Sequence, residues 1–305
     1  LLSLGVGPGD EVVIPAFSYV ATANVVELVG AKPVFVDTRS DSFNIDPDRI
    51  EAAITSCTKV LMPVHEFGHP ADMDQIIDIA NAHRLPVVED AACALGSEWN
   101  GRKVGSWGQI GSFSLHPRKA VTSGEGGILT TNDAKLADFF RIMRNHGNNS
   151  ATGGADFVAA GFNYRMTDIQ AALVVGQVER LEAIIAKRNA IVSQYDKHLD
   201  PRFFQKPAPP LNGRTTWQSY HIVLNQDVEQ AHFLRYLSGK HIGSNYGAQC
   251  IPVQNYYRKK YGYGIDDFPE AYRAFRQGIV LPLFDKMTEA QASYVIETIN
   301  AYRGQ

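Results

Sequence analysis

The sequence predicts an α/β protein: a mostly parallel sheet with helices on both faces, then a smaller C-terminal α+β domain. In the first half of the chain, short apolar runs alternate strictly with helix-like segments. This alternation is typical of parallel βαβ units. From about Thr167 the rhythm changes to one long helical stretch and then a strand mixed with helices. We therefore expect a large domain over residues 1–185 and a small domain over 186–305.

The first half supplies the alternating elements in order. Strands are predicted over residues 11–19, 32–37, 58–68, 85–92, 111–115 and 126–132. Helices are predicted over residues 21–30, 46–54, 71–84 and 133–147. Asp46 is a favoured N-cap and Pro47 suits the first helical position. Gly30 marks the end of the first helix.

The second half predicts fewer and longer elements. Residues 167–199 are expected to form one helix, because no glycine interrupts the stretch after Gly176. A strand at 215–224 and helices at 229–243 and 288–302 follow. Long helices of this kind often connect two domains, which places the predicted boundary inside this one.

Composition excludes several classes of protein. The chain has 305 residues, of which 45% are hydrophobic, and a net charge of −3, which argues against a nucleic-acid-binding surface. Its three cysteines are far apart and form no CxxC pair, so we expect no disulfide framework and a cytoplasmic protein. We find neither a run of ~18 apolar residues nor a signal peptide, and expect no membrane association.

Ligands of open parallel sheets bind at the carboxyl ends of the strands. Three places satisfy that rule: Tyr19 after the first strand, the segment EDAAC that contains Asp90, and the loop that contains Lys119. Lys119 is followed by TSGEGG, whose glycines allow the backbone to approach a ligand closely.

Lys119 and Asp90 together indicate pyridoxal phosphate (PLP) chemistry. PLP enzymes need a lysine for the Schiff base and an acid opposite the pyridine nitrogen. Ser114, Thr122 and Ser123 are hydroxyl residues near Lys119 that suit a phosphate site. Taken singly, Asp90 is equally a helix N-cap, and Lys119 an ordinary surface lysine.

Five segments resemble, in order and spacing, the DegT/DnrJ/EryC1/StrS family of PLP-dependent sugar-nucleotide aminotransferases of fold type I. The segments are PAFSYVATANVVELVGAKPVFVD, PVHEFGHPADMD, VVEDAACALGS, GSFSLHPRKAVTSGEGGILTTND and GFNYRMTDIQAAL. The resemblance extends to the C-terminal LPLFDKMTEAQASYVIETI and so covers nearly the whole chain.

The resemblance implies roles for individual residues. Lys119 matches the lysine that binds PLP covalently, and Asp90 matches the aspartate that keeps the pyridine nitrogen protonated. Tyr19 matches an aromatic residue that stacks on the ring, and Ser114 a phosphate-binding serine. Asn163 matches an asparagine that reaches the phosphate of the neighbouring subunit's cofactor, so the resemblance implies a homodimer with shared active sites.

The same resemblance implies the reaction partners. The amino donor would be an amino acid, usually L-glutamate, and the acceptor a nucleotide-linked keto sugar. The product would be an amino sugar for polysaccharide or glycoside synthesis. Relatives that act as sugar 3-dehydratases carry histidine at the position of Lys119, so the lysine favours amino transfer. The sugar, the nucleotide and the carbon aminated (C3 or C4) are not specified by the sequence.

The chain departs from the family pattern in two places. Cys93 stands where the family usually has a glutamine that contacts the ring hydroxyl, and a thiol is a weak hydrogen-bond donor. In addition, the chain starts with LLSLG, after the point where the family has a phosphate-binding Ser-Gly-Thr segment. We expect that such a segment is missing upstream, and that the phosphate site of this chain is incomplete.

Four residues are candidates for the sugar pocket: His116, Asn145, His146 and Tyr246. The segment RNHG that contains two of them also fits a helix C-terminus stopped by Gly147. Metal binding is not expected, because the histidines at 65, 116 and 146 lack the i, i+4 spacing of a helical zinc site.

Structural alternatives exist for three of the cofactor candidates. Tyr19 is also compatible with a core position, Ser114 with a satisfied strand serine, and Asn163 with a turn. A catalytically silent PLP-fold dimer is the alternative function. A nicotinamide-dependent enzyme is disfavoured, because the first strand lacks the glycine fingerprint.

Overall fold

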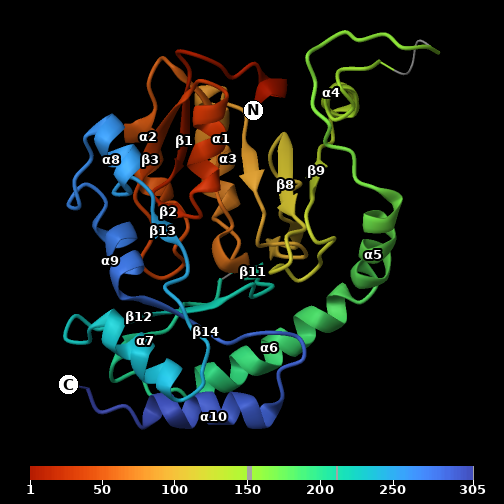
Figure 1. Ribbon diagram of the computed structural model, residues 1–305. Coiled ribbons are helices and arrows are strands. Elements are labelled where there is room, and N and C mark those ends of the chain that lie inside the picture. Colours follow the sequence, from red (N-terminus) through yellow and green to blue (C-terminus); the bar gives the residue numbers. More distant parts are fainter. Residues whose placement is uncertain (150–152, 211, 305) are drawn as a thin grey trace.

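The computed structural model describes residues 1–149, 153–210 and 212–304. Strands that lie side by side form the centre of its larger part (Figure 1). These strands are β1 (Glu11–Pro15), β3 (Lys32–Val36), β4 (Thr58–Leu61), β5 (Val88–Asp90), β8 (Ile110–Ser114) and β9 (Gly127–Thr130). They pair in the orders β3-β1-β4 and β5-β8-β9. Two isolated parallel bridges, Leu61–Val87 and Val64–Asp90, join the two groups.

The direction of these strands confirms the mostly parallel sheet. β1 is parallel to β3 and β4, and β5 is parallel to β8, whereas the edge strand β9 runs antiparallel to β8. Parallel neighbours end at the same edge of a sheet. The carboxyl ends of β4, β5 and β8 are therefore brought together, and they carry most of the candidate site.

Helices cover both faces of this sheet, as predicted. The covering helices are α1 (Ala21–Leu28), the short α2 (Ile50–Ala53), α3 (Met73–His83), α8 (Asn255–Tyr261) and α9 (Pro269–Gln277). Alternate residues of β1 point to opposite faces. Val12 and Ile14 belong to a core that includes residues of α1, α8 and α9, whereas Val13 packs in a core with residues of α2 and α3.

The smaller part contains an antiparallel sheet and three helices. Its elements are β10 (Phe204–Gln205), β12 (Tyr220–Leu224), β14 (Gly278–Leu281), α6 (Leu181–His198), α7 (Gln230–Gly239) and α10 (Glu289–Asn300). Their apolar faces share one core that includes Tyr195, Tyr220 and Phe233. This mixture agrees with the α+β character expected there, and the boundary at residue 185 stays a prediction.

The other elements of the described residues connect these two parts or lie at their edges. They are η1 (Leu2–Leu4), β2 (Phe17–Ser18), η2 (Pro47–Arg49), η3 (Glu66–Gly68), β6 (Glu98–Trp99), β7 (Arg102–Lys103), α4 (Ala134–Met143), α5 (Asp168–Val178), β11 (Gly213–Arg214) and β13 (Gln249–Cys250). β2 pairs antiparallel with β13, and β6 pairs with both β7 and β11. Residues from opposite ends of the chain thus lie side by side.

The single helix predicted over residues 167–199 is wrong. The structure has two helices, α5 and α6, separated at Glu179 and Arg180 and running in different directions (Figure 1). The guanidinium Nε of Arg180 donates to the carbonyl oxygen of Gly176 at 3.0 Å. Gln177 also bonds the loop at Thr122, so tertiary contacts hold α5 on the large part while α6 crosses to the small one.

The strand predicted over residues 58–68 is also too long. β4 ends at Leu61, and Pro63, which has no N–H to give to a ladder, follows. The chain then forms the turn η3, in which Phe67 adopts a left-handed φ of 54°. Glu66 and Phe67 therefore lie in a turn beyond the carboxyl end of the strand.

The N-terminus of α10 offers a direct test of the smaller part's core. Thr288 accepts from the N–H of Gln291, whose side chain accepts from the N–H of Thr288 in return. Thr288→Ala should lower the free energy of unfolding by about 1 kcal/mol, because it removes this capping box. Thr288→Ser keeps the hydroxyl and should retain most of the stability in urea denaturation. Equal losses in both variants would contradict a capping role.

Candidate active site

Asp90 lies at the carboxyl end of β5 and is fixed by hydrogen bonds to both carboxylate oxygens. Thr22, at the start of α1, donates its hydroxyl to Oδ2 of Asp90 at 2.8 Å. Because that proton is used, the Ser18 hydroxyl donates to Oγ1 of Thr22 at 3.0 Å. The N–H of Ala92 donates to Oδ1 at 3.2 Å. Each oxygen of Asp90 keeps a lone pair free for a further donor.

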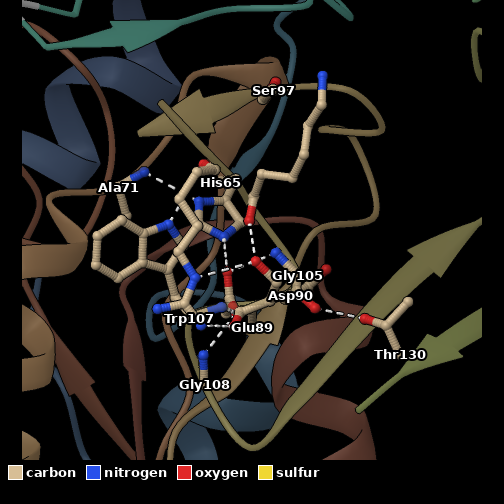
Figure 2. Close-up of polar contacts among 12 residues, drawn as sticks. His65, Ala71, Glu89, Asp90, Ser97, Gly105, Trp107, Gly108 and Thr130 are labelled. Atoms are coloured by element: carbon tan, nitrogen blue, oxygen red, sulfur yellow. Dashed lines mark hydrogen bonds and ion pairs between the residues drawn. The ribbon is translucent and has the colours of Figure 1, made fainter. Parts of the chain in front are cut away.

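Glu89, the preceding residue, is fully buried and anchors this strand end (Figure 2). Its carboxylate accepts from the N–H groups of Gly105, Trp107 and Gly108 at 2.6–2.8 Å. The ring of His65 completes the set, with Nε2 3.1 Å from Oε2 of Glu89. Nδ1 of His65 accepts from the N–H of Ala71, so Nε2 carries the proton and donates to Glu89.

These contacts determine the charge of Glu89. Burial alone would raise the pKa of this carboxyl, but the hydrogen bond from His65, together with those from backbone N–H groups, lowers the pKa below its usual value. Glu89 is therefore an ionised, satisfied structural acid, and it ties the turn after β7 to the end of β5.

Lys119 follows β8 and approaches the segment after Asp90. Its Nζ donates to Sγ of Cys93 at 2.9 Å. Burial raises the pKa of the Cys93 thiol, and the positive charge of Lys119 only partly offsets this. The sulfur is thus a neutral acceptor for the lysine. The loop is held by the N–H of Lys119, which donates to the carbonyl of His116 at 2.9 Å.

A second carboxyl, that of Glu66, faces the same cluster. Glu66 is 4% exposed and lies in the turn after β4. Burial, followed by the negative charge of Asp90, raises the pKa of Glu66 to about 8, and the charge of Lys119 acts in the opposite direction. Two acids and one lysine thus meet at the edge where three strands end.

Tyr19 and Ser114 stand beside this cluster. Tyr19 lies between Ser18 and Thr22 on the turn that holds Asp90, and with 58% of its surface exposed it is not the core residue that the alternative predicted. Ser114 accepts from the N–H of His116 at 3.2 Å, which leaves its own proton free to donate. Thr122 and Ser123 donate instead to carbonyl oxygens of their own loop.

The residues present fit PLP. An anchored carboxylate with unused lone pairs suits a protonated pyridine nitrogen, and a lysine amine nearby suits an aldehyde. The exposed ring of Tyr19 can stack on a flat ligand, and Ser114 offers a hydroxyl. No helix begins after Asp90, so the N-cap alternative for this aspartate is wrong.

The remaining candidates lie in other places. His116 adjoins Lys119, whereas Asn145, His146 and Asn163 lie in the loop that follows α4. Asn145 and Asn163 form an antiparallel bridge there, and Asn163 is exposed. Tyr246 packs edge-on against Phe275, with ring centroids 5.7 Å apart. Their roles in binding the sugar, or the neighbouring cofactor, stay predictions.

Sequence analysis missed Thr22 and Glu66. The rule that selected Asp90, a polar side chain directly after a buried strand, also applies to Glu66 once β4 ends at Leu61. The role of Thr22 has no comparable local signal, because its partner Asp90 lies 68 residues further along the chain.

A parallel α/β sheet with a lysine and a fixed carboxylate at its carboxyl edge defines a PLP-dependent enzyme of the aminotransferase class. The chain belongs to the DegT/DnrJ/EryC1/StrS aminotransferase family, whose sequence pattern matches residues 1–300. This is a family of PLP-dependent sugar aminotransferases, and the predicted family, fold and cofactor are confirmed.

Individual relatives agree with this assignment. The chain is 42% identical over 230 residues to GDP-perosamine synthase of Caulobacter vibrioides, covering 75% of this chain and 62% of the synthase. It is 34% identical over 316 residues to an uncharacterized protein of Methanocaldococcus jannaschii, covering 99% of this chain and 81% of that protein. This chain thus spans less than two thirds of the synthase.

Solved structures give the same picture. Spr1654 of Streptococcus pneumoniae, described as a sugar aminotransferase, superimposes in its PMP form with a TM-score of 0.93 at 31% identity, over 98% of this chain and 81% of that one. DesV of S. venezuelae, solved with a ketimine intermediate, gives a TM-score of 0.91 at 30% identity over 98% and 80% of the two chains.

Within residues 1–149, 153–210 and 212–304, no helix combines the length and the apolar character needed to span a bilayer. Within the same residues, no group of three or more His, Cys, Asp and Glu side chains is arranged to hold a metal ion.

Removing the carboxylate of Glu89 should destabilise the fold. Glu89→Ala leaves three buried N–H donors and His65 without an acceptor, and we expect a loss of about 3–5 kcal/mol in the free energy of unfolding. Glu89→Gln keeps one acceptor oxygen and should lose less. Denaturant titration of both variants tests this, and an unchanged stability of Glu89→Ala would contradict it.

The same carboxylate makes stability depend on pH. Its pKa in the folded protein lies below the ordinary value of 4.5. The stabilisation is therefore present above pH 4.5 and is lost as the pH falls through the lower folded pKa. Wild type should lose this contribution in acid, whereas Glu89→Gln, which does not titrate, should not.

Proposed function

We propose that this chain is an aminotransferase that uses PLP to transfer an amino group from L-glutamate to a nucleotide-linked keto sugar. The observation that carries the proposal is the cluster of Lys119, Cys93 and Asp90 at the carboxyl edge of the sheet. Family membership and the similarity to GDP-perosamine synthase support a nucleotide sugar as the acceptor.

PLP supplies an aldehyde and an electron-accepting ring, which carry the amino group between donor and acceptor. Lys119 would hold PLP through Nζ, and the same atom, when free as an amine, would take and return a proton. Asp90 holds a proton on the ring nitrogen, with its orientation fixed by Thr22 and Ala92. Tyr19 covers a face of the ring, and Ser114 donates to the phosphate.

We further propose that a second copy of the chain covers α5 and the loop before it. Several large apolar side chains are exposed there: Phe157, Val158, Phe162, Tyr164, Ile169, Leu173, Val175 and Val178. In α5 itself only Val174 is buried. An apolar surface of this extent marks an association site.

The position of this surface favours a shared active site. Gln177 of α5 bonds the backbone of Thr122, and Gln170 donates to the carbonyl of Glu125, so α5 is joined to the Lys119 loop. The rings of Phe162 and Tyr164 stack 4.8 Å apart on either side of Asn163 in the sequence. A subunit seated here would lie next to the loop that carries Lys119, and Asn163 would belong to the surface that it contacts.

Replacing the lysine tests the catalytic assignment. PLP bound to Lys119 should give an absorption band at the violet end of the visible spectrum, which Lys119→Ala abolishes. Amino transfer should fall by at least about a thousandfold, because the same residue binds PLP and moves the proton. Lys135→Ala, a change at an exposed lysine on α4, is the matched control.

The acceptor is identified with a panel of keto sugars linked to GDP, UDP and dTDP, with L-glutamate and other amino acids as donors. Turnover of at least one pair is the expected result. A visible band without turnover of any pair would favour the silent-dimer alternative, and the absence of any band would contradict PLP chemistry in this chain.

Charge introduced on α5 should separate the subunits. Ile169, 78% exposed, and Leu173 lie one helical turn apart. Ile169→Asp with Leu173→Asp should convert a dimer to a monomer in light scattering, with a loss of activity. Leu28→Asp, at an 84% exposed leucine on α1, should remain dimeric. A monomeric wild type would refute the proposal.

A further inference from the structure

A parallel bridge between Val64, just beyond the end of β4, and Asp90 of β5 brings Glu66 close to Asp90. The N–H of Asp90 donates to the carbonyl of Pro63 at 2.9 Å, and the N–H of His65 donates back to the carbonyl of Asp90 at 3.0 Å. The N–H of Glu66 is held by Oδ1 of Asn44 at 2.8 Å. Glu66 is thus a buried carboxyl with a fixed backbone at the same edge as Asp90.

The turn behind Glu66 is fixed by aromatic packing. Phe67 has a left-handed φ of 54°, which is unfavourable for a bulky residue and persists only where the surroundings impose it. Its ring stacks on the buried imidazole of His221, with centroids 4.7 Å apart, and meets Phe17 and Phe43 edge-on. This packing holds the preceding carboxyl in one place.

The groups around Glu66 come from three other elements. The charges that act on its carboxyl are those of Asp90 from β5 and Lys119 from the loop after β8, and Ser18 of β2 contributes a hydrogen bond. The charges of Lys119, Glu66 and Asp90 all act on the pKa of the Cys93 thiol. Glu66 and Cys93 are therefore both close enough to the aspartate and the lysine to interact with them electrostatically.

The charge state of Glu66 follows from these neighbours. Burial and the charge of Asp90 raise the pKa of Glu66 to about 8, against the opposing charge of Lys119 and the hydrogen bond from the backbone N–H of Phe67. At neutral pH the side chain is a carboxylic acid, which donates a hydrogen bond strongly, whereas a thiol donates weakly. The site thus contains an acid that has a proton to give.

A role for Glu66 in binding PLP rests on the proposed function. Along one edge, the PLP ring carries its nitrogen, a methyl group, a phenolic oxygen and the aldehyde carbon. With Asp90 at the nitrogen and Lys119 at the aldehyde, the groups between them face the oxygen. We propose that Glu66 is a cofactor-binding residue that donates its carboxyl proton to the phenolic oxygen of PLP.

This role makes cofactor binding depend on the proton of Glu66. Once ionised, the carboxylate has nothing to donate and repels both the phenolic oxygen and Asp90. If only the neutral form supports binding, the pKa of about 8 predicts a PLP affinity about tenfold weaker at pH 9 than at pH 6.5 from this group alone. Glutamine keeps an N–H donor and does not titrate.

The experiment measures the dissociation constant of PLP between pH 6.5 and pH 9 for wild type, Glu66→Gln and Glu66→Leu, by absorbance and protein fluorescence. Titration of free PLP is common to all three proteins and cancels in ratios of their dissociation constants. The dissociation constant of wild type divided by that of Glu66→Gln should rise about tenfold from pH 6.5 to pH 9. Glu66→Leu, which lacks a donor, should bind roughly tenfold more weakly than Glu66→Gln at every pH.

The outcomes distinguish a failure of the proposed role of Glu66 from a failure of the proposed aminotransferase function. If wild type binds PLP but the ratio of its dissociation constant to that of Glu66→Gln does not change with pH, the role of Glu66 is contradicted. The aminotransferase assignment is then unaffected. Equal affinities of Glu66→Gln and Glu66→Leu do the same. Failure of wild type to bind PLP at any pH contradicts both proposals. Circular dichroism of each variant establishes that the folded proteins are being compared.

Discussion

The buried carboxylate of Glu89 is the contact on which the candidate active site depends. It joins three backbone N–H groups of the turn before β8 to His65, and so links the ends of β4 and β5 to the turn that leads into β8. Successive side chains of a strand point to opposite sides. Fixing Glu89 on one side therefore fixes Asp90 on the other, where Thr22 and Ala92 complete its orientation.

Two buried glutamates show how their surroundings set opposite charge states. Glu89 has backbone donors and an imidazole directed at it, and its pKa is lowered. Glu66 is buried beside a negative aspartate, and its pKa is raised. The first acid is an acceptor that holds structure together, and the second is a potential donor at a ligand site. The fold thus uses one residue type for two purposes at adjacent strand ends.

Local patterns predicted much of the fold but only part of the site. Asp90 and Lys119 were found because strand ends are visible as apolar runs followed by polar residues. Glu66 was missed because the predicted strand continued to residue 68 and so included the glutamate. The observed strand β4 ends at Leu61, before Pro63, and leaves Glu66 in a turn. The break between α5 and α6 depends on tertiary bonds, such as those of Gln177 to Thr122, that no local pattern reveals.

The pairing of β2 with β13 has a consequence for how the protein is made. Ser18 and Gln249 are partners in that ladder, and Oε1 of Gln249 accepts from the N–H of Val20 at 3.3 Å. The turn that carries Tyr19 thus gets its support from a strand synthesised more than 200 residues later. Contacts between such distant residues form slowly. Until β13 has been synthesised and has folded back, β2 and the turn after it lack their hydrogen-bonded partner.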